Sequence, residues 1–256
     1  MGWVLLFKNV ANPVIAYFGS VQYLFYFESV RKRYLNATNL SVVEIPDLHM
    51  CTMKSNMTDS IANTTGNTTG TRPNATDYAS SHAATQSLSA DILCTMHAKY
   101  ELLKRAAQVN PYRTSHMLWV DVGSYNAPSR IKPRRFSVNV PKGSDNQRVS
   151  YWASGNTSSN RNLSDVFREQ AVWLDGNFVF GTTQTLITWS DTYMSAVANY
   201  LRHNQVGTDE TSLYAMMLDT QYKYRDRVKI YSNGTDPQFS ELRETFAGVK
   251  IPMKGI

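Results

Sequence analysis

The sequence has no apolar run of the roughly 18 residues that a membrane-spanning helix needs. Its start lacks the basic segment and the small-residue cleavage site of a signal peptide. It has only two cysteines, in no metal-binding spacing such as C-x-x-C. Its five histidines form no H-E-x-x-H pattern, and none of them follows His203. The residues therefore indicate neither a membrane span nor a zinc site.

The excess of positive charge is also small. The chain has 26 lysines and arginines and 20 acids, which gives a net charge of +6. The surplus lies in short clusters at 31–33, 104–105, 132–135 and 223–229. No RNA- or DNA-binding motif accompanies them, so we do not expect nucleic acid as a partner. Clusters this short usually form solvated faces, and the alternative is an anionic ligand such as a diphosphate or an acidic glycan.

N-x-[ST] sequons are abundant. Nine begin at Asn36, Asn39, Asn56, Asn63, Asn67, Asn74, Asn156, Asn162 and Asn233. So many sequons predict a glycoprotein that folds in the secretory pathway, located in the Golgi or ER lumen or outside the cell. Because no signal peptide begins the sequence, we expect a signal or anchor segment upstream of Met1. Contact with a membrane is expected only through that anchor.

Residues 52–90 are rich in Ser, Thr, Asn, Ala and Gly and nearly free of large apolar side chains. Such a stretch buries too little surface to offset its ordering entropy, so we predict a disordered, glycosylated insertion within a single domain of residues 1–256. Cys51 and Cys94 bracket it. In an oxidising lumen they could form a disulfide at its base, and two unrelated buried thiols are the open alternative.

The rest of the chain alternates between helix and strand patterns, which predicts an α/β fold. The expected strands lie at 13–18, 40–46, 116–123, 134–140, 178–180 and 227–232. The expected helices lie at 1–11, 19–35, 89–110, after the turn at 181–183 as far as His203, and from a Thr208 cap onward. In the second helix we expect an apolar face at Val21, Leu24, Phe25 and Val30.

The stretch "HMLWVDVGSYN" contains an apolar run that ends in a carboxylate, Asp121. An acid at the carboxyl end of a buried strand is where an open α/β sheet places ligand chemistry. The ordinary alternative is an aspartate that caps the following turn.

Four segments carry a family resemblance: "NPVIAYFG…SVRKRY", "AKYELLKRAAQVNPYRTSHMLWVDVGSY", "NFVFGTTQTLITWSDTY" and "VGTDETSLYAMML". In this order they resemble the HtrL/YibB-like (WlaTC/HtrL) glycosyltransferase family, over most of the chain outside 52–90 and about 130–165. The resemblance implies a GT-A nucleotide-diphospho-sugar transferase fold, with a Rossmann-like mixed, mostly parallel sheet flanked by helices. In that family a first strand precedes the helix before "NPVIAY", so we expect this strand to be missing here and the sheet to expose an edge.

The function implied is an enzyme of hexosyltransferase type. It would move a sugar from a nucleotide-sugar donor to a hydroxyl of a glycan or glycoprotein acceptor. The alternative is a non-catalytic secreted or cell-surface glycoprotein of the same fold that binds glycan. The donor-binding residues implied by the resemblance are Lys99, Asp121, Gly123, Gly181 and Thr182.

Asp121 is also the implied metal ligand for Mn²⁺ or Mg²⁺, because GT-A enzymes hold a cation with a D-x-D-like element. Here Asp121-Val122-Gly123 has no second acid. This departure from the family pattern leaves open whether the protein depends on a metal ion. The implied catalytic residues are Asp209 and Glu210, with Asp209 favoured as the base that takes the acceptor proton. Acids in the first turn of a helix also have a purely structural explanation, since they complement the helix dipole.

Overall fold

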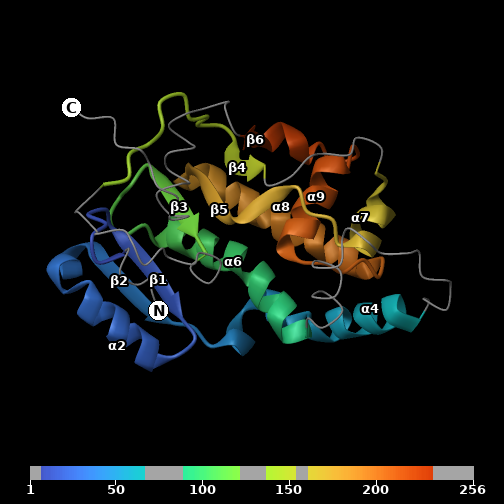
Figure 1. Cartoon of the computed structure of the whole chain (residues 1–256), viewed down its shortest axis with the longest axis horizontal. Helices are drawn as coiled ribbons and strands as arrows, with labels where there is room; N and C mark the ends of the chain where they lie inside the picture. The colour runs from blue at the N-terminus through green and yellow to red at the C-terminus, as the bar shows by residue number, and fades with distance from the viewer. Residues whose placement is uncertain (1–6, 67–88, 122–136, 154–160, 233–256) are drawn as a thin grey trace, which may run out of the picture.

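The computed structural model describes residues 7–66, 89–121, 137–153 and 161–232 (Figure 1). These residues form a mixed α/β fold, which confirms the fold class expected from the alternating pattern. The helix expected at 1–11 lies mostly outside the described residues. Residues 137–140, expected to be part of a strand, form none. No helix in the described ranges is both long and apolar enough to cross a membrane.

The strands form two sheets. The strands are β1 (Val14–Phe18), β2 (Thr38–Val42), β3 (His116–Val120), β4 (Val149–Ala153), β5 (Leu174–Thr182) and β6 (Val228–Tyr231). The pair β1–β2 is parallel, and the larger sheet has the order β3-β5-β4-β6. In that sheet β5 runs antiparallel to both neighbours, and only β4 and β6 are parallel.

The described strands therefore do not form the single, mostly parallel sheet that the resemblance implied. The apolar pattern of a strand indicates which face it buries, whereas the direction of its neighbours depends on how the connections cross the sheet.

Three helices build the centre of the molecule, and each begins at a hydroxyl cap. They are α6 (Ala90–Val109), α8 (Thr183–Arg202) and α9 (Asp209–Leu218). The side chains of Ser89, Thr182 and Thr208 accept the backbone N–H three residues on, which satisfies one free donor at each helix start. The caps at Ser89 and Thr208 were expected from the sequence. Figure 1 shows α6 and α8 lying side by side at the centre of the fold, next to the larger sheet.

Aromatic side chains fill the space between α6, α8 and β4. The rings of Tyr100 and Tyr193 stack with their centroids 3.7 Å apart. The Trp189 Nε1–H donates to the Tyr151 hydroxyl at 2.6 Å, and that hydroxyl donates to Tyr100 at 3.1 Å. Because these polar atoms are buried and paired, the network fixes how α6 and α8 sit against the sheet.

Helix α2 (Val21–Val30) buries a different face from the one expected. Phe27 is 3% exposed and packs between the rings of Phe7 and Phe18, whereas Phe25 is 62% exposed. The helix has apolar residues all round, so periodicity alone could not select the buried side.

Residues 52–66 were predicted to be part of a disordered insertion, but they are mostly helical. They contain the end of α3 (His49–Thr52) and all of α4 (Lys54–Gly66). Met57 is fully buried, and Ile61, one turn later, packs against the core. Met57 and Ile61 are four residues apart, so they lie on the same face of α4. The low apolar content of 52–90 as a whole concealed these two residues. Residues 67–88 lie outside the described part of the chain.

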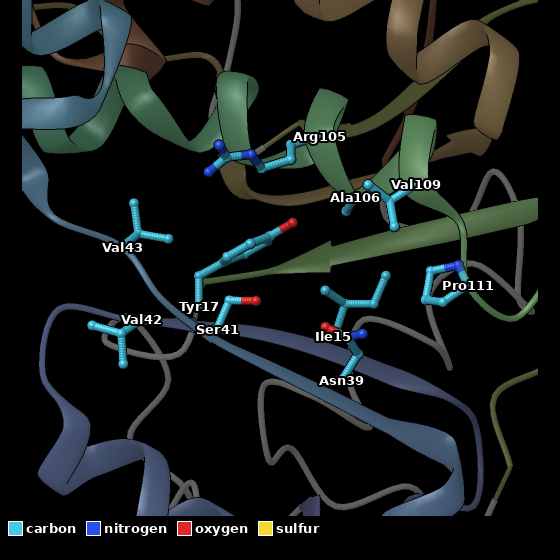
Figure 2. A pocket seen from close by; sticks show the side chains of 10 residues that line it. All are labelled: Ile15, Tyr17, Asn39, Ser41, Val42, Val43, Arg105, Ala106, Val109 and Pro111. Atoms are coloured by element: carbon cyan, nitrogen blue, oxygen red, sulfur yellow. The ribbon is translucent and has the colours of Figure 1, made fainter.

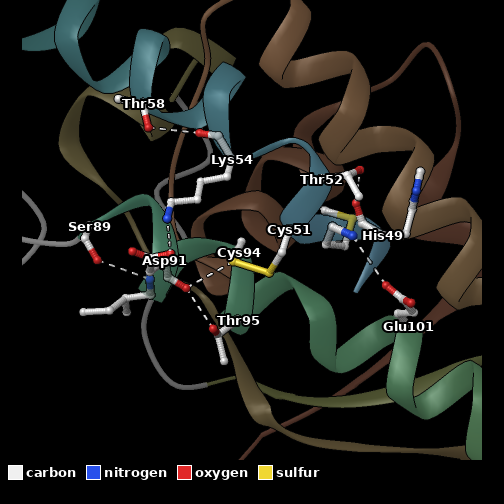
Figure 3. The surroundings of a disulfide bond; sticks show 12 residues. His49, Cys51, Thr52, Lys54, Thr58, Ser89, Asp91, Cys94, Thr95 and Glu101 are labelled. Atoms are coloured by element: carbon white, nitrogen blue, oxygen red, sulfur yellow. Dashed lines mark hydrogen bonds and ion pairs between the residues drawn. A yellow bond between two sulfur atoms is a disulfide. The ribbon is translucent and has the colours of Figure 1, made fainter. Parts of the chain in front are cut away.

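A disulfide joins Cys51 in α3 to Cys94 in the second turn of α6 (Figure 3). Of the two alternatives left open by the sequence, the structure therefore has the bonded pair. Figure 3 also shows the ion pair between Lys54 and Asp91, which ties the start of α4 to the same part of α6.

Removing the disulfide is expected to lower the free energy of unfolding by about 4 kcal/mol, because it closes a loop with a sequence separation of 43 residues. Urea denaturation of Cys51→Ser, Cys94→Ser and the double variant tests this. All three variants break the same bond, so we expect similar losses. A loss below about 1 kcal/mol would contradict the prediction.

Candidate functional site

Four of the residues suggested by the sequence come together where β3 ends and β5 begins. Lys99 comes from the middle of α6, Asp121 follows β3, and Asp209 and Glu210 open α9. The Asp121 N–H donates to the carbonyl of Asn177 at 2.9 Å, so Asp121 lies against the first residues of β5. Segments more than 80 residues apart thus contribute to one cluster.

Lys99 is the centre of this cluster, with a side chain only 4% exposed. Its Nζ lies 2.6 Å from Asp209 Oδ2, 2.9 Å from the Gly176 carbonyl and 3.7 Å from Asp121 Oδ2. Burial alone would lower the pKa of Lys99, but the carboxylates of Asp209, Asp121 and Glu210 outweigh it and raise the pKa. The ammonium is therefore kept charged, within hydrogen-bond distance of Asp209 and the Gly176 carbonyl and in a longer ion pair with Asp121.

Asp209 is closed to solvent, at 1% exposure, and its carboxylate is held by Lys99. The sequence favoured Asp209 as the base. A general base has to reach the proton that it removes, and the burial of this carboxylate closes it to an external hydroxyl. The role of Asp209 as the base stays a prediction, and the structure shows its carboxylate buried against Lys99.

Glu210 is the partly exposed member of the acid pair. Its Oε1 accepts from the Gly176 N–H at 3.2 Å and from Asn177 Nδ2 at 3.4 Å. Burial, with added repulsion from Asp209 and Asp175, raises the pKa of Glu210 to about 7. A carboxyl that exchanges its proton near neutral pH suits general base chemistry.

Gly176 lets β5 approach the acid pair. A Cβ at this position would overlap Asp209 Oδ2 and would lie 3.2 Å from Glu210 Cγ. The dipeptide Asp175-Gly176 was not among the residues selected from the sequence. A glycine inside an apolar strand is nevertheless a recognised signal of close backbone approach, and it could have found this position.

Gly176→Ala is expected to lower the free energy of unfolding by about 1–3 kcal/mol, because the new methyl group displaces Asp209 from Lys99. Gly181→Ala in the same strand is the matched control, since its Cβ would lie 3.4 Å from Leu186 side-chain atoms and 3.8 Å from Val149 Cα, without overlap. Thermal denaturation of both variants measures the difference. Equal effects of the two substitutions would contradict the crowding argument.

His97 supports the loop before α9, a role that no sequence pattern indicated. Its Nε2 lies 3.0 Å from the Gly207 carbonyl, which can only accept, so the ring nitrogen Nδ1 accepts from the Tyr193 hydroxyl at 2.7 Å. Burial lowers the pKa of His97 to about 4. The neutral ring therefore fixes the backbone two residues before Asp209.

His97 makes stability depend on acid pH. Its pKa is about 4 in the folded chain against an ordinary value of 6.5, so the unfolded chain binds the proton more readily between these values. Stability is fully present above pH 6.5 and is lost, on the order of 3 kcal/mol, as the pH falls toward 4. His97→Gln should flatten this slope in urea denaturation curves taken across that range. An unchanged slope would show that other groups cause it.

The residues described do not fit the metal that the resemblance implied. In the described ranges, no group of three or more His, Cys, Asp or Glu side chains could hold a metal ion. The Lys99 ammonium lies between the carboxylates of Asp121 and Asp209, where a cation shared by both would sit. Gly123 lies outside the described residues.

Gly181 and Thr182, the other expected donor-binding residues, lie at the far end of β5. Gly181 pairs with Met117 near the start of β3, and Thr182 caps α8. Five residues separate Gly181 from Gly176, which is roughly 17 Å along a strand. The structure therefore does not bring these two residues to the Lys99 cluster.

The sequons differ in accessibility. Asn36, Asn56 and Asn162 are exposed, and Asn162 also caps α7 (Leu163–Glu169). Asn39 instead lines a hollow of about 330 Å³ between the β1–β2 pair and α6. Figure 2 shows Tyr17 pointing across this hollow toward α6, with Asn39 on the strand side and Arg105 on the helix side. Asn39 is therefore less suited to carry a glycan than Asn36. The Asn63 side chain, Asn67, Asn74, Asn156 and Asn233 lie outside what the structure describes.

The fold and the cluster define a mixed α/β protein with a buried lysine held among carboxylates at a strand end. The chain belongs to the HtrL_YibB family, described as "Bacterial protein of unknown function", whose model matches residues 7–232. The family resemblance seen in the sequence is thereby confirmed, while the family's description assigns no activity. No curated protein and no solved structure matches the chain.

Proposed function

We propose that this protein is a glycosyltransferase of hexosyltransferase type with a GT-A-like site, working in the secretory pathway. It would move a sugar from a nucleotide-sugar donor to a hydroxyl of a glycan or glycoprotein. The observation that carries the proposal is Glu210, whose pKa is raised to about 7 by burial and by repulsion from Asp209 and Asp175. It lies in the cluster in which Lys99 also pairs with the 39% exposed carboxylate of Asp121. An accessible base at the end of a sheet strand is what transfer to a hydroxyl requires.

In a direct displacement, Glu210 takes the proton from the acceptor hydroxyl. The hydroxyl oxygen forms a bond to the anomeric carbon as the bond from that carbon to the diphosphate breaks. The electron pair of the broken bond leaves with the nucleoside diphosphate. The Lys99–Asp209 ion pair holds the first turn of α9, so that the Glu210 carboxylate stays at the Gly176 N–H.

The second candidate is a non-catalytic glycoprotein of the same fold that binds glycan. The placement of Lys99 favours it, because the ammonium occupies the space between the two carboxylates in which a shared metal ion would lie. Asp121 is also not followed by a second acid.

Donor binding and donor turnover separate these candidates. We would follow thermal stability against a panel of nucleotide sugars, each with and without Mn²⁺, and assay release of the nucleoside diphosphate. A donor at about 100 times its Kd should add about 2.7 kcal/mol of stability. That shift should disappear in Asp121→Ala and persist in Asp59→Ala, an exposed acid on α4.

A shift with turnover supports the transferase. A shift without turnover on any acceptor supports the non-catalytic relative. The absence of a shift with every donor, from a protein shown to be folded, would overturn the transferase proposal.

A further inference from the structure

A second hollow, of about 510 Å³, lies away from the Lys99 cluster, between the outward face of α8 and the segment that follows α9. Side chains of α8, namely Thr192, Ser195 and Asn199, line one side of it. Tyr222 and Tyr224 line the other side. Helix α8 turns its opposite face, with Trp189 and Tyr193, to the core, so this hollow is separate from the candidate site.

The tyrosines give the hollow a flat aromatic wall. Their rings stack with centroids 5.4 Å apart and an interplanar angle of 23°, and Tyr222 is 46% exposed. An exposed tyrosine ring offers an apolar face with a polar tip. The Ser195 hydroxyl and the Asn199 amide can donate to or accept from sugar hydroxyls, whereas the Thr192 hydroxyl is bonded to the Thr188 carbonyl and to Arg227. This pairing of an apolar face with dense hydrogen-bonding groups matches the two kinds of surface that a sugar ring presents.

Arginines mark the two ends of the hollow. Arg202, the last residue of α8, forms no ion pair within the described ranges. Arg227 belongs to the 3-10 helix η4 (Tyr224–Arg227), and its Nη1 donates to Thr192 Oγ1 at 2.9 Å. Thr192 and Arg202 are ten residues apart on α8, roughly 15 Å along its axis. The acid that also lines the hollow, Asp191, is already paired with Lys104 at 2.6 Å.

These features select the class of ligand. Guanidinium groups bind carboxylates and sulfates through paired N–H donors. One small anion cannot reach arginines this far apart, whereas successive acidic sugars can present a charge to each. We propose that this hollow binds an acidic oligosaccharide, a chain of sugars that carry carboxylate or sulfate groups. The site assigns a role to Arg227 of the basic cluster at 223–229, and it does not depend on the proposed transferase activity.

The test is calorimetric titration of the whole chain with a heparin-derived tetrasaccharide, at about 0.15 M salt and without any nucleotide sugar. Neutral chitotetraose and a single-stranded oligonucleotide of equal charge are the comparison ligands. Arg202→Gln and Tyr222→Ser should each weaken tetrasaccharide binding about tenfold. The matched control is Arg33→Gln in the 3-10 helix η1 (Lys32–Ala37), which removes an exposed charge near α2, well separated from α8 in Figure 1.

We expect the tetrasaccharide to bind and chitotetraose not to bind, with Arg33→Gln changing the affinity by less than about twofold. Failure of the folded protein to bind the tetrasaccharide would overturn the proposal. Equal weakening by Arg33→Gln and Arg202→Gln would show diffuse charge attraction, and an unaffected Tyr222→Ser would remove the sugar-binding wall. Oligonucleotide binding of equal strength would likewise overturn selectivity for a glycan.

Discussion

Replacing Lys99 with methionine is expected to lower the free energy of unfolding by about 3–5 kcal/mol, because it leaves the buried Asp209 carboxylate without its counter-charge. Methionine has a similar length and keeps the apolar contacts of the lysine stem, so the loss reports the charge and not a cavity. Urea denaturation at neutral pH measures it. Lys104→Met is the matched control, because Lys104 lies on the same helix and pairs with Asp191 at the same 2.6 Å. That pair is 27% and 53% exposed, so its removal should change stability by less than about 1 kcal/mol.

A double-variant cycle tests whether the effect belongs to the pair. Asp209→Asn alone leaves a buried ammonium facing an amide, and it should also destabilise the chain. The combination of Lys99→Met with Asp209→Asn removes both charges, so its loss should be smaller than the sum of the two single losses. Strictly additive losses would show that the two side chains do not act as a unit.

Three members of the cluster have a local signal in the sequence, whereas Lys99 was indicated only by the family resemblance. Asp121 ends an apolar strand, and the acids at 209 and 210 follow a helix cap. The difference in burial between Asp209 and Glu210 could not be predicted from the sequence. It depends on Gly176 and Lys99, which are distant in the chain and bury Asp209 while leaving Glu210 partly exposed.

The glycines of β5 show the same limit. Gly176 and Gly181 both interrupt an apolar strand, and the sequence directed attention to Gly181 because a threonine turn follows it. Only the pairing of β5 with β3 shows that Gly176 lies beside Asp121 while Gly181 lies at the opposite end. In α4, buried Met57 and partly buried Ile61 pack a helix against the core although its composition resembles that of a disordered segment.

Glu210→Gln is expected to abolish most activity while it stabilises the fold at alkaline pH. The amide keeps the oxygen that accepts from the Gly176 N–H but cannot take a proton, so kcat should fall by about 10²–10⁴-fold. In the wild-type chain kcat should rise as the pH rises through about 7, where Glu210 loses its proton, and the variant should lose this limb. Glu44→Gln, at an exposed glutamate, should leave both kcat and its pH profile unchanged.

The stability half of this prediction needs no donor. The pKa of Glu210 is raised in the folded chain from 4.5 to about 7, so the folded state holds the proton more tightly than the unfolded state within that window. Wild-type stability therefore gains from Glu210 at low pH and loses that gain as the pH rises through 7, the opposite slope to that of His97. In urea denaturation, Glu210→Gln should approach wild-type stability near pH 4.5 and exceed it above pH 7. A difference between variant and wild type that does not change with pH would show that Glu210 titrates normally and is not the base. With its raised pKa, Glu210 would lower stability at the working pH and still be needed for turnover. Such a trade-off between stability and activity is expected of a catalytic group.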